Sequence, residues 1–311
     1  AMAEGALGLS TGLVYPPARA APTSEAIALS KIAAAHGGVY ATHLRDEGEH
    51  LERSVEEALT IGREAGLPVV LSHHKVLGKP NHGKTARTLP MIDAARKTQR
   101  VALDVYPYIA SSTVLSPDRV ASSARVIVTW SKRHPEQGGR DLADIAAEWN
   151  LSPEDAATRL LPAGAVYFAM AEEDVRRVLA WPEAMIGSDG LPHDTHPHPR
   201  LWGTFPRVLG HYARELGLFA MEEAIRRMTS LTAKRLGLRD RGTVRAGAFA
   251  DIVVFDPKTV IDRATFAAPK QAGEGIDMTF VNGRLVWKNG ASTGARPGRF
   301  LARDAGAMDY S

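Results

Sequence analysis

Short apolar runs alternate with longer helical patterns from residue 5 to about residue 235, and this alternation constrains the fold most strongly. Strands are predicted at residues 5–14, 39–44, 69–72, 101–106 and 185–188. Helices are predicted at residues 24–35, 51–65, 88–97, 205–215 and 221–228. This order is typical of parallel βαβ units, whose strands are apolar throughout because helices cover both faces of the sheet.

A doubly wound sheet and a (β/α)8 barrel both fit this alternation, and polar clusters at the strand ends favour the barrel. The clusters are Thr42–Arg45, Ser72–Lys75, Asp104–Tyr106 and Ser188–Gly190. A barrel enzyme carries its functional groups at the carboxyl ends of several strands. A doubly wound fold would gather them at one switch point with a glycine-rich turn, and the sequence has no such motif.

Three side chains at these strand ends suit a metal ion. His43 and His73 follow consecutive predicted strands, and Asp189 follows a later one. A single histidine in such a place is usually structural, but in a barrel the three ends converge on one mouth. Two imidazoles and a carboxylate are typical ligands of a catalytic zinc ion, which keeps one position open for water. The sequence therefore predicts a zinc site formed by these three residues.

Composition excludes several other classes of function. The 311 residues include no cysteine, so disulfides, thiol catalysis and cysteine-bound zinc are excluded within the chain. The net charge is +3 and no run of five or six basic residues occurs, so we expect neither a nucleic-acid nor a membrane partner. The first residues lack the basic and apolar segments of a signal peptide, which favours a cytoplasmic location.

Two segments interrupt the βα rhythm. Residues 108–169 form a long insertion, with an apolar run at 126–130 and a helical run at 141–149, and we interpret it as a lid over the barrel mouth. From residue 237 the pattern changes to short strands, and Asn282-Gly283 between alternating runs predicts a hairpin. We predict a barrel portion at residues 1–236 and part of a small β-sandwich domain at 237–311.

Several blocks resemble the N-acyl-D-amino-acid deacylase (D-aminoacylase) family of the amidohydrolase superfamily. The most specific is Gly187-Ser188-Asp189-Gly190-Leu191-Pro192-His193-Asp194 with the residues that follow, up to 210. Further blocks occur at 9–17, 42–45, 72–75, 104–108, 127–130 with 139–140, and 250–256. The resemblance extends over essentially the whole chain and corresponds to the C-terminal two thirds of the family's members.

The resemblance implies hydrolysis of an N-acyl-D-amino acid to a carboxylate and a free D-amino acid, with one tightly bound Zn²⁺. His43 and His73 resemble the family's strand-borne zinc ligands. Asp189 resembles its catalytic aspartate, which takes a proton from the attacking water and gives it to the leaving amine. The groups that resemble those holding the substrate's α-carboxylate are Lys75, Tyr106 and Arg200, with Tyr15 and Ser112 as helpers. Tyr167 and Met170 could line an apolar side-chain pocket.

The sequence departs from the superfamily in one respect. The first barrel strand of the superfamily carries a His-x-His pair, and these deacylases add a cysteine metal ligand, whereas this chain has its only His-x-His after Asp189. We therefore expect an incomplete barrel without its first strands, and a chain that by itself binds zinc poorly and is not catalytically competent.

Two alternatives remain at this point. One is a cyclic amidohydrolase of the dihydroorotase or dihydropyrimidinase type, which has the same barrel and ligand layout. The other is an inactive fragment, whose open sheet edges would invite aggregation.

Overall fold

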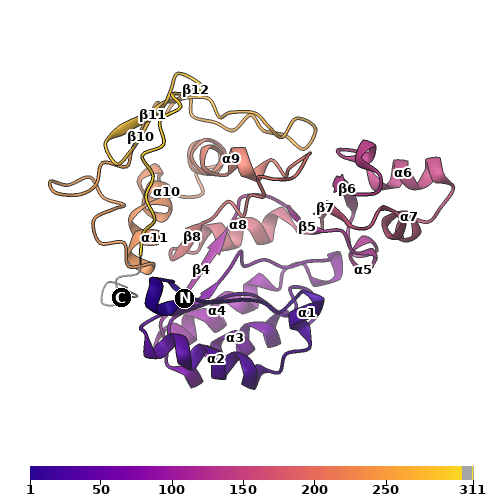
Figure 1. Ribbon diagram of the computed structural model, residues 1–311, viewed down its shortest axis with the longest axis horizontal. Coiled ribbons are helices and arrows are strands. Elements are labelled where there is room, and N and C mark those ends of the chain that lie inside the picture. The colour runs from indigo at the N-terminus through magenta and orange to yellow at the C-terminus, as the bar shows by residue number, and fades with distance from the viewer. Residues whose placement is uncertain (303–309, 311) are drawn as a thin grey trace.

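A five-stranded parallel sheet is the centre of the computed structural model, which describes residues 1–302 and 310 (Figure 1). Its order is β1-β2-β3-β4-β8. The strands span Gly8–Gly12 (β1), Val39–His43 (β2), Val69–Leu71 (β3), Val101–Val105 (β4) and Ala184–Ile186 (β8). All neighbouring strands pair in parallel, so their carboxyl ends lie along one edge of the sheet. In the described residues β1 and β8 are the two edges, and the sheet forms part of a (β/α)8 barrel.

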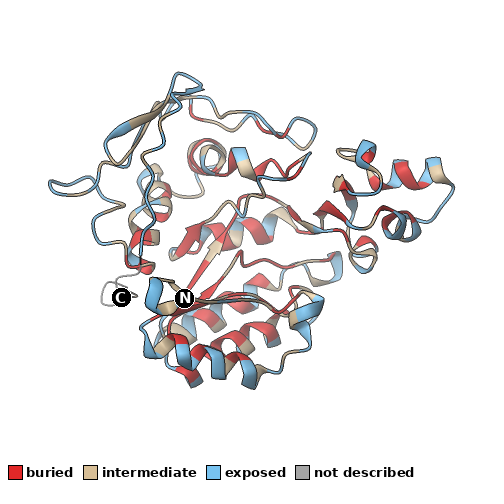
Figure 2. Cartoon of the chain, in the orientation of Figure 1, coloured by how far each residue is buried: buried red, intermediate tan, exposed pale blue. Residues whose placement is uncertain are grey.

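Helices pack on one face of this sheet and bury their apolar sides against it (Figure 2). They are α2 (Thr23–Ala35), α3 (Leu51–Ala65), α4 (Thr85–Arg96) and α8 (Glu172–Ala180). The predicted helix at 51–65 is confirmed with the same bounds, because its apolar residues recur on one face and Gly66 ends it in the left-handed conformation, with φ of 73°. Leu51, Val55 and Ile61 from that face are fully buried.

The remaining helices of the barrel portion follow β8. They are α9 (Arg200–Arg207), a π-helical segment η4 (Val208–Glu215), α10 (Met221–Met228) and α11 (Ser230–Arg235). The helix predicted at 205–215 begins earlier, at Arg200, and changes its hydrogen-bonding pattern at Val208. Short helical turns complete this portion: η1 (Met2–Glu4), α1 (Pro16–Arg19) and η2 (Lys79–Asn81). The strand predicted at 5–14 is therefore confined to its central residues.

The insertion forms a compact unit that projects from the parallel sheet (Figure 1). It contains a three-stranded antiparallel sheet in the order β5-β7-β6, which the sequence did not reveal. Its elements are β5 (Ala110–Val114), α5 (Pro117–Val120), β6 (Arg125–Ser131), η3 (Pro135–Gln137), α6 (Leu142–Trp149), α7 (Pro153–Leu160) and β7 (Ala163–Phe168). The unit has its own apolar core, in which Val128, Ile145 and Leu160 are fully buried.

The C-terminal portion is a four-stranded antiparallel sheet in the order β12-β11-β10-β9. The strands are β9 (Ile252–Phe255), β10 (Ile276–Val281), β11 (Arg284–Lys288) and β12 (Ala291–Ser292). Asn282 and Gly283 connect β10 to β11 with φ of 48° and 75°, the pair of positive values that a two-residue type I′ turn requires, so the predicted hairpin is present. The described residues provide one layer here, and the predicted sandwich stays a prediction.

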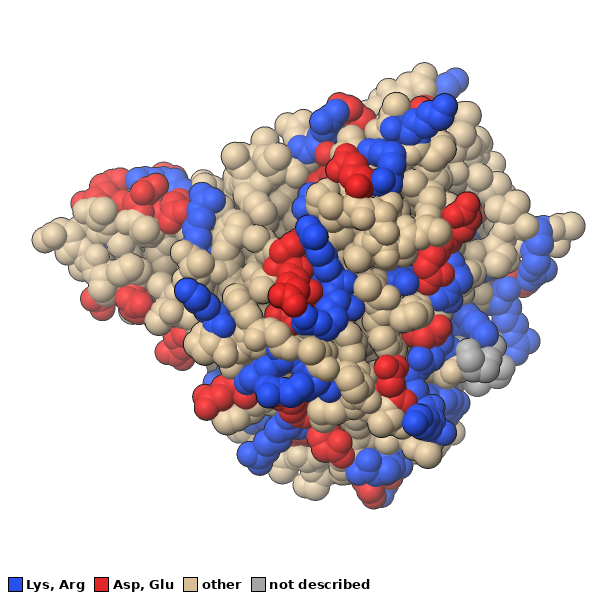
Figure 3. Space-filling model, turned by 180° about the vertical axis from the view of Figure 1, so that it is seen from behind, with Lys and Arg blue, Asp and Glu red and all other residues tan. Residues whose placement is uncertain are grey.

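The surface carries charges of both signs. Figure 3 shows acidic and basic side chains interspersed over the face opposite to that of Figure 1. None of the helices in residues 1–302 and 310 combines the length and apolar character that crossing a lipid bilayer requires.

Candidate functional site

The candidate site lies at the carboxyl edge of the parallel sheet. His43 is the last residue of β2, His73 lies two residues beyond β3, and Asp189 lies three residues beyond β8. His73 and Asp189 have positive φ values of 41° and 47°, which non-glycine residues rarely adopt. Backbone strain of this kind persists where the surrounding structure enforces it, and it concentrates at functional sites.

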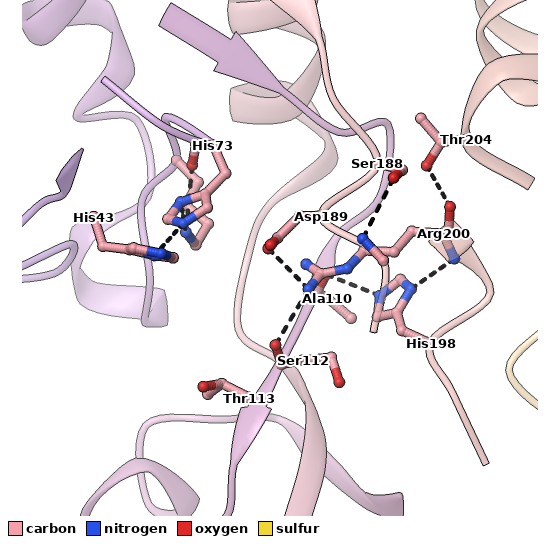
Figure 4. A network of polar contacts seen from close by, with 12 residues as sticks. His43, His73, Ala110, Ser112, Thr113, Ser188, Asp189, His198, Arg200 and Thr204 are labelled. Carbon is pink, nitrogen blue, oxygen red and sulfur yellow. Dashed lines mark hydrogen bonds and ion pairs between the residues drawn. The ribbon is translucent and has the colours of Figure 1, made fainter. Parts of the chain in front are cut away.

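The two imidazoles of the predicted metal site meet directly. His43 Nδ1 and His73 Nε2 are in contact, and the ring centroids are 4.2 Å apart (Figure 4). Tyr15 packs edge-on against His43, with centroids 5.6 Å apart. Burial and the neighbouring His73 and Lys75 lower the pKa of His43 to about 4. The imidazole is therefore neutral at physiological pH, which is the protonation state that binds a metal ion.

A buried carboxylate lies behind His73. Glu47 Oε1 is 2.5 Å from Lys75 Nζ and 3.2 Å from His73 Nδ1, and Lys75 Nζ is 2.6 Å from the same imidazole nitrogen. Although burial opposes ionisation, the charge of Lys75 and the hydrogen bond from His73 keep the pKa of Glu47 below its ordinary value. Asp104 accepts a hydrogen bond from the His73 backbone N–H at 3.0 Å, which holds the turn after β3 in place.

Lys75, predicted to hold the substrate's α-carboxylate, reaches the site through a turn rather than from a strand. In a continuous strand Lys75 would share a face with His73 through alternation, but β3 ends at Leu71 and His73 lies in a turn. The turn brings the Lys75 ammonium back to His73 Nδ1. His74 points away, and its Nε2 contacts Thr88 Oγ1 on α4 at 2.8 Å, as expected for a structural residue.

Asp189 and Arg200 form the second half of the site. Arg200 Nη2 is 2.8 Å from Asp189 Oδ2, and it also donates to the Ser112 backbone oxygen at 3.2 Å. The Arg200 side chain is 1% exposed, whereas that of Asp189 is 33% exposed. In Figure 4, Asp189 lies between the imidazole pair and Arg200.

Several buried polar groups around Arg200 lack a hydrogen-bond partner among the described residues. They are Arg200 Nε and Nη1, Tyr106 Oη and Ser112 Oγ. The guanidinium carbon of Arg200 lies 4.5 Å from the centre of the Tyr106 ring. A buried donor without a partner costs about 1–3 kcal/mol, so this arrangement of donors suits the binding of an anion.

The fit to a metal ion rests on the donor set. Two imidazole nitrogens converge, as in a zinc site, but in residues 1–302 and 310 no three His, Cys, Asp or Glu side chains gather closely enough to hold an ion. Asp189, predicted as a third ligand, is paired with Arg200 instead. The described residues thus fit a metal as two of its ligands, and the ligand role of Asp189 stays a prediction.

A cleft runs between this site and the insertion. Its lining includes Tyr15, Glu47, Leu77, Phe168 and Met170. Met170 lines this cleft, although its side chain is largely buried. Tyr167 does not line this cleft, because its ring belongs to the core of the insertion. Its hydroxyl accepts from the Ser116 N–H at 2.8 Å and donates to the Val114 oxygen at 3.0 Å.

Tyr15 and Ser112, predicted as helpers, are divided between the two halves of the site. The Tyr15 hydroxyl is 3.0 Å from Thr113 Oγ1, beside His43, and Ser112 lies under Arg200. Sequence reasoning missed two residues that contact the site. Glu47 was missed because the segment after β2 contains several carboxylates, and the sequence does not indicate which of them points into the site. His198 is buried and accepts a hydrogen bond from the Arg200 backbone N–H at 2.9 Å.

A parallel β/α sheet with imidazoles and a carboxylate at its carboxyl edge is the arrangement of the metal-assisted barrel hydrolases. The chain belongs to the Amidohydrolase family, whose sequence profile matches residues 17–287.

Within this family the similarity is to the D-aminoacylases. The chain is 58% identical to a D-aminoacylase of Alcaligenes xylosoxydans xylosoxydans over 305 residues, which cover 98% of the chain and 63% of that protein. A D-aminoacylase crystal structure superposes with a TM-score of 0.95 at 55% identity, covering 97% of this chain and 64% of that one. The N-acyl-D-glutamate deacylase of Bordetella bronchiseptica, solved with zinc and a phosphonate inhibitor, gives 0.93 at 48% identity, with 96% and 63% covered. The chain thus spans somewhat less than two thirds of the length of these relatives.

Proposed function

We propose that the chain carries the proton-transfer and carboxylate-binding part of a zinc-dependent hydrolase of N-acyl-D-amino acids. The observation that carries the proposal is the pairing of the two halves of the site. The imidazoles of His43 and His73 meet on one side of Asp189, and the buried donors of Arg200 lie on the other (Figure 4). The similarity to deacylases at 48–58% identity supports the same reaction.

His43 and His73 would hold the metal through Nδ1 and Nε2, the nitrogens that face each other. A zinc ion bound there would supply Lewis-acid polarisation of the amide carbonyl. We propose that the ion occupies one tight site. Asp189 is the only carboxylate paired with Arg200 in the described residues, and its partial exposure lets water reach it. It would accept the proton of the attacking water as the new C–O bond forms, and then donate it to the amine nitrogen as the amide C–N bond breaks.

The substrate's α-carboxylate would bind at Arg200. One guanidinium nitrogen is engaged by Asp189 and Ser112, which leaves Nε and Nη1 free to donate among the described groups. Tyr106 and Ser112 add two hydroxyls without partners. Lys75 supplies a second positive charge 5.9 Å from the Tyr106 ring. A free carboxylate satisfies these donors, which favours an acyl-amino acid over a cyclic amide that lacks a carboxylate.

The test compares two proteins. One is this chain, and the other is a chimera that adds the part of the Alcaligenes D-aminoacylase that the chain does not match. Zinc content and acetate release from N-acetyl-D-methionine and N-acetyl-L-methionine are measured on both. We expect the chimera to hydrolyse the D-isomer. Asp189→Asn should lower its kcat by about 10²–10⁴-fold, the usual contribution of general acid–base catalysis.

A zinc-loaded chimera that hydrolyses neither isomer would overturn the proposal. Equal hydrolysis of N-acetyl-D-methionine and its carboxamide would overturn the assignment of Arg200 as the carboxylate site, because the carboxamide lacks the anion.

A further inference from the structure

We infer that Glu47 is a positioning residue that sets the tautomer of His73. This inference rests on the proposed metal site, and it concerns a carboxylate to which neither the family resemblance nor the chemistry above assigns a role. Glu47 projects from the loop after β2, and its side chain is 6% exposed.

Lys75 and Glu47 favour opposite tautomers of His73. Lys75 Nζ lies 2.6 Å from His73 Nδ1, and an ammonium can only donate hydrogen bonds. If Lys75 donates to Nδ1, the imidazole proton must reside on Nε2, the nitrogen that faces His43. A protonated Nε2 has no lone pair for a metal ion. The Lys75 contact alone would therefore select the tautomer that cannot bind zinc.

Glu47 provides the opposite preference. Its Oε1 is 3.2 Å from His73 Nδ1, and a carboxylate can only accept. Among the contacts of His73 Nδ1 in the described residues, Glu47 is the one side chain that can accept an Nδ1–H. With the proton on Nδ1, the lone pair of Nε2 faces His43. Histidine ligands commonly donate their second N–H to such a carboxylate, which fixes both tautomer and ring orientation.

Glu47 also draws the ammonium away from the ring. The Lys75 Nζ–Glu47 Oε1 separation is 2.5 Å, which makes the carboxylate the nearest acceptor for the Lys75 donors. One oxygen atom thus binds the ammonium and accepts from the imidazole. Because all three groups are buried, bulk water offers no substitute acceptor. A Glu47→Gln change removes the negative charge while keeping the shape of the side chain. Lys75 would then turn its donors to His73 Nδ1.

The experiment reads the tautomer directly. Side-chain ¹⁵N chemical shifts of His73 are measured on the zinc-free protein, with His73→Gln used for assignment. We expect the Nδ1–H tautomer in the unsubstituted protein and the Nε2–H tautomer in Glu47→Gln. Zinc affinity, measured by competition with a chelator, should fall about 10- to 100-fold in Glu47→Gln, as for other carboxylates that support a histidine ligand.

Two further variants separate positioning from a general structural effect. In Glu47→Gln/Lys75→Met the competing ammonium is absent and the amide oxygen can accept the Nδ1–H, so the tautomer and part of the zinc affinity should return. Glu57→Gln is the matched control. It disrupts a partly buried pair with Arg45, 2.8 Å apart, and Glu57 has no contact with His73. This control should leave the tautomer and zinc affinity unchanged.

An unchanged His73 tautomer in Glu47→Gln would overturn the inference, and so would an Nε2–H tautomer in the unsubstituted protein. Absence of zinc binding in the unsubstituted protein and in the chimera would instead count against the proposed function. The NMR measurement on zinc-free protein is independent of that result.

Discussion

At the scale of single residues, some buried charged groups of the site are fully paired and others are not. Lys75 is paired with Glu47, whereas Arg200 has nitrogen atoms without an acceptor among the described residues. The Arg200 guanidinium is almost fully buried, yet two of its nitrogens have no acceptor among the described residues. Such a group stabilises the fold poorly, because its desolvation is not fully offset. A buried cation of this kind is better explained by a ligand than by stability.

The first prediction concerns Arg200. Arg200→Lys in the chimera should raise KM for N-acetyl-D-methionine by about 10-fold or more, because each hydrogen bond to a charged group contributes about 1.5–3 kcal/mol. Steady-state kinetics measure the change. Arg227→Lys is a matched control, since Arg227 is equally buried but pairs with Glu223 at 2.7 Å, on α10. A KM that responds equally to both changes would contradict a specific role for Arg200.

The sequence predicts the position of a site residue when a regular element fixes it, and does not when the path of a loop fixes it. His43 and His73 were predicted to meet because each follows a strand of a parallel sheet, and they do meet. Arg200 and Asp189 were predicted for separate roles, and their ion pair was not anticipated. Glu47 was missed because Asp46, Glu47 and Glu49 are equivalent in sequence. Only the path of the loop decides which of the three carboxylates turns inward.

At the scale of elements, close approach of helix to sheet depends on small residues. Gly62 of α3 faces Val69 of β3, and a β-carbon built on Gly62 would lie 2.1 Å from Val69 Cγ2. The helix therefore packs at a distance that only glycine permits. The amphipathic pattern predicted the bounds of α3, but the pattern carries no information about this distance.

The second prediction tests that packing. Gly62→Ala should destabilise the protein by about 1–3 kcal/mol through overpacking, although alanine favours a helix by about 1 kcal/mol over glycine. Urea unfolding measures the change. In a Val69→Ala background the space is opened, so the same substitution should cost less. An increase in stability from Gly62→Ala alone would show that the helix can shift freely.

The third prediction concerns the insertion. Tyr167→Phe removes the hydroxyl that bonds to Ser116 N and Val114 O, and leaves both backbone groups without that partner. We expect a local loss of about 1–3 kcal/mol. Hydrogen exchange should accelerate for amides of residues 110–168 and remain unchanged in α3. Uniform acceleration would indicate that the insertion and the parallel sheet open as one unit.

The sheet of the insertion shows why elements of this kind escape prediction. β6 was foreseen as an apolar run, but its partner β7 follows only after α6 and α7. Antiparallel pairing across such a separation leaves no local periodicity. The C-terminal hairpin was predictable because both strands and the turn lie within one short segment.

At the scale of the whole molecule, the proposed metal site connects β2 and β3 through two side chains. The fourth prediction follows from this linkage. Zinc at 100 times its Kd should stabilise the protein by about 2.7 kcal/mol and raise Tm, because it binds only the folded state. Differential scanning fluorimetry with and without a chelator measures the shift. His43→Ala and His73→Ala should each abolish it.

His193→Ala is the control for this measurement. His193 is a histidine of the loop after Asp189, and its side chain is 75% exposed. The zinc-dependent shift should persist in that variant. Loss of the shift in His193→Ala would mean that the loop supplies a ligand.

The register of the insertion has a consequence for how the length of this segment can vary. Ala110 at its start pairs with Phe168 at its end, so the chain leaves the barrel and returns to it across a single rung of β-ladder. The two ends of the insertion therefore lie as close together as the ends of a tight turn. The segment beyond Val114 and Gly164, the last pair of this ladder, can therefore change in length while Ser112, whose backbone oxygen accepts from Arg200, keeps its place. Leu115, which lines the cleft, lies in this variable segment, whereas His43, His73 and Asp189 follow strands of the parallel sheet.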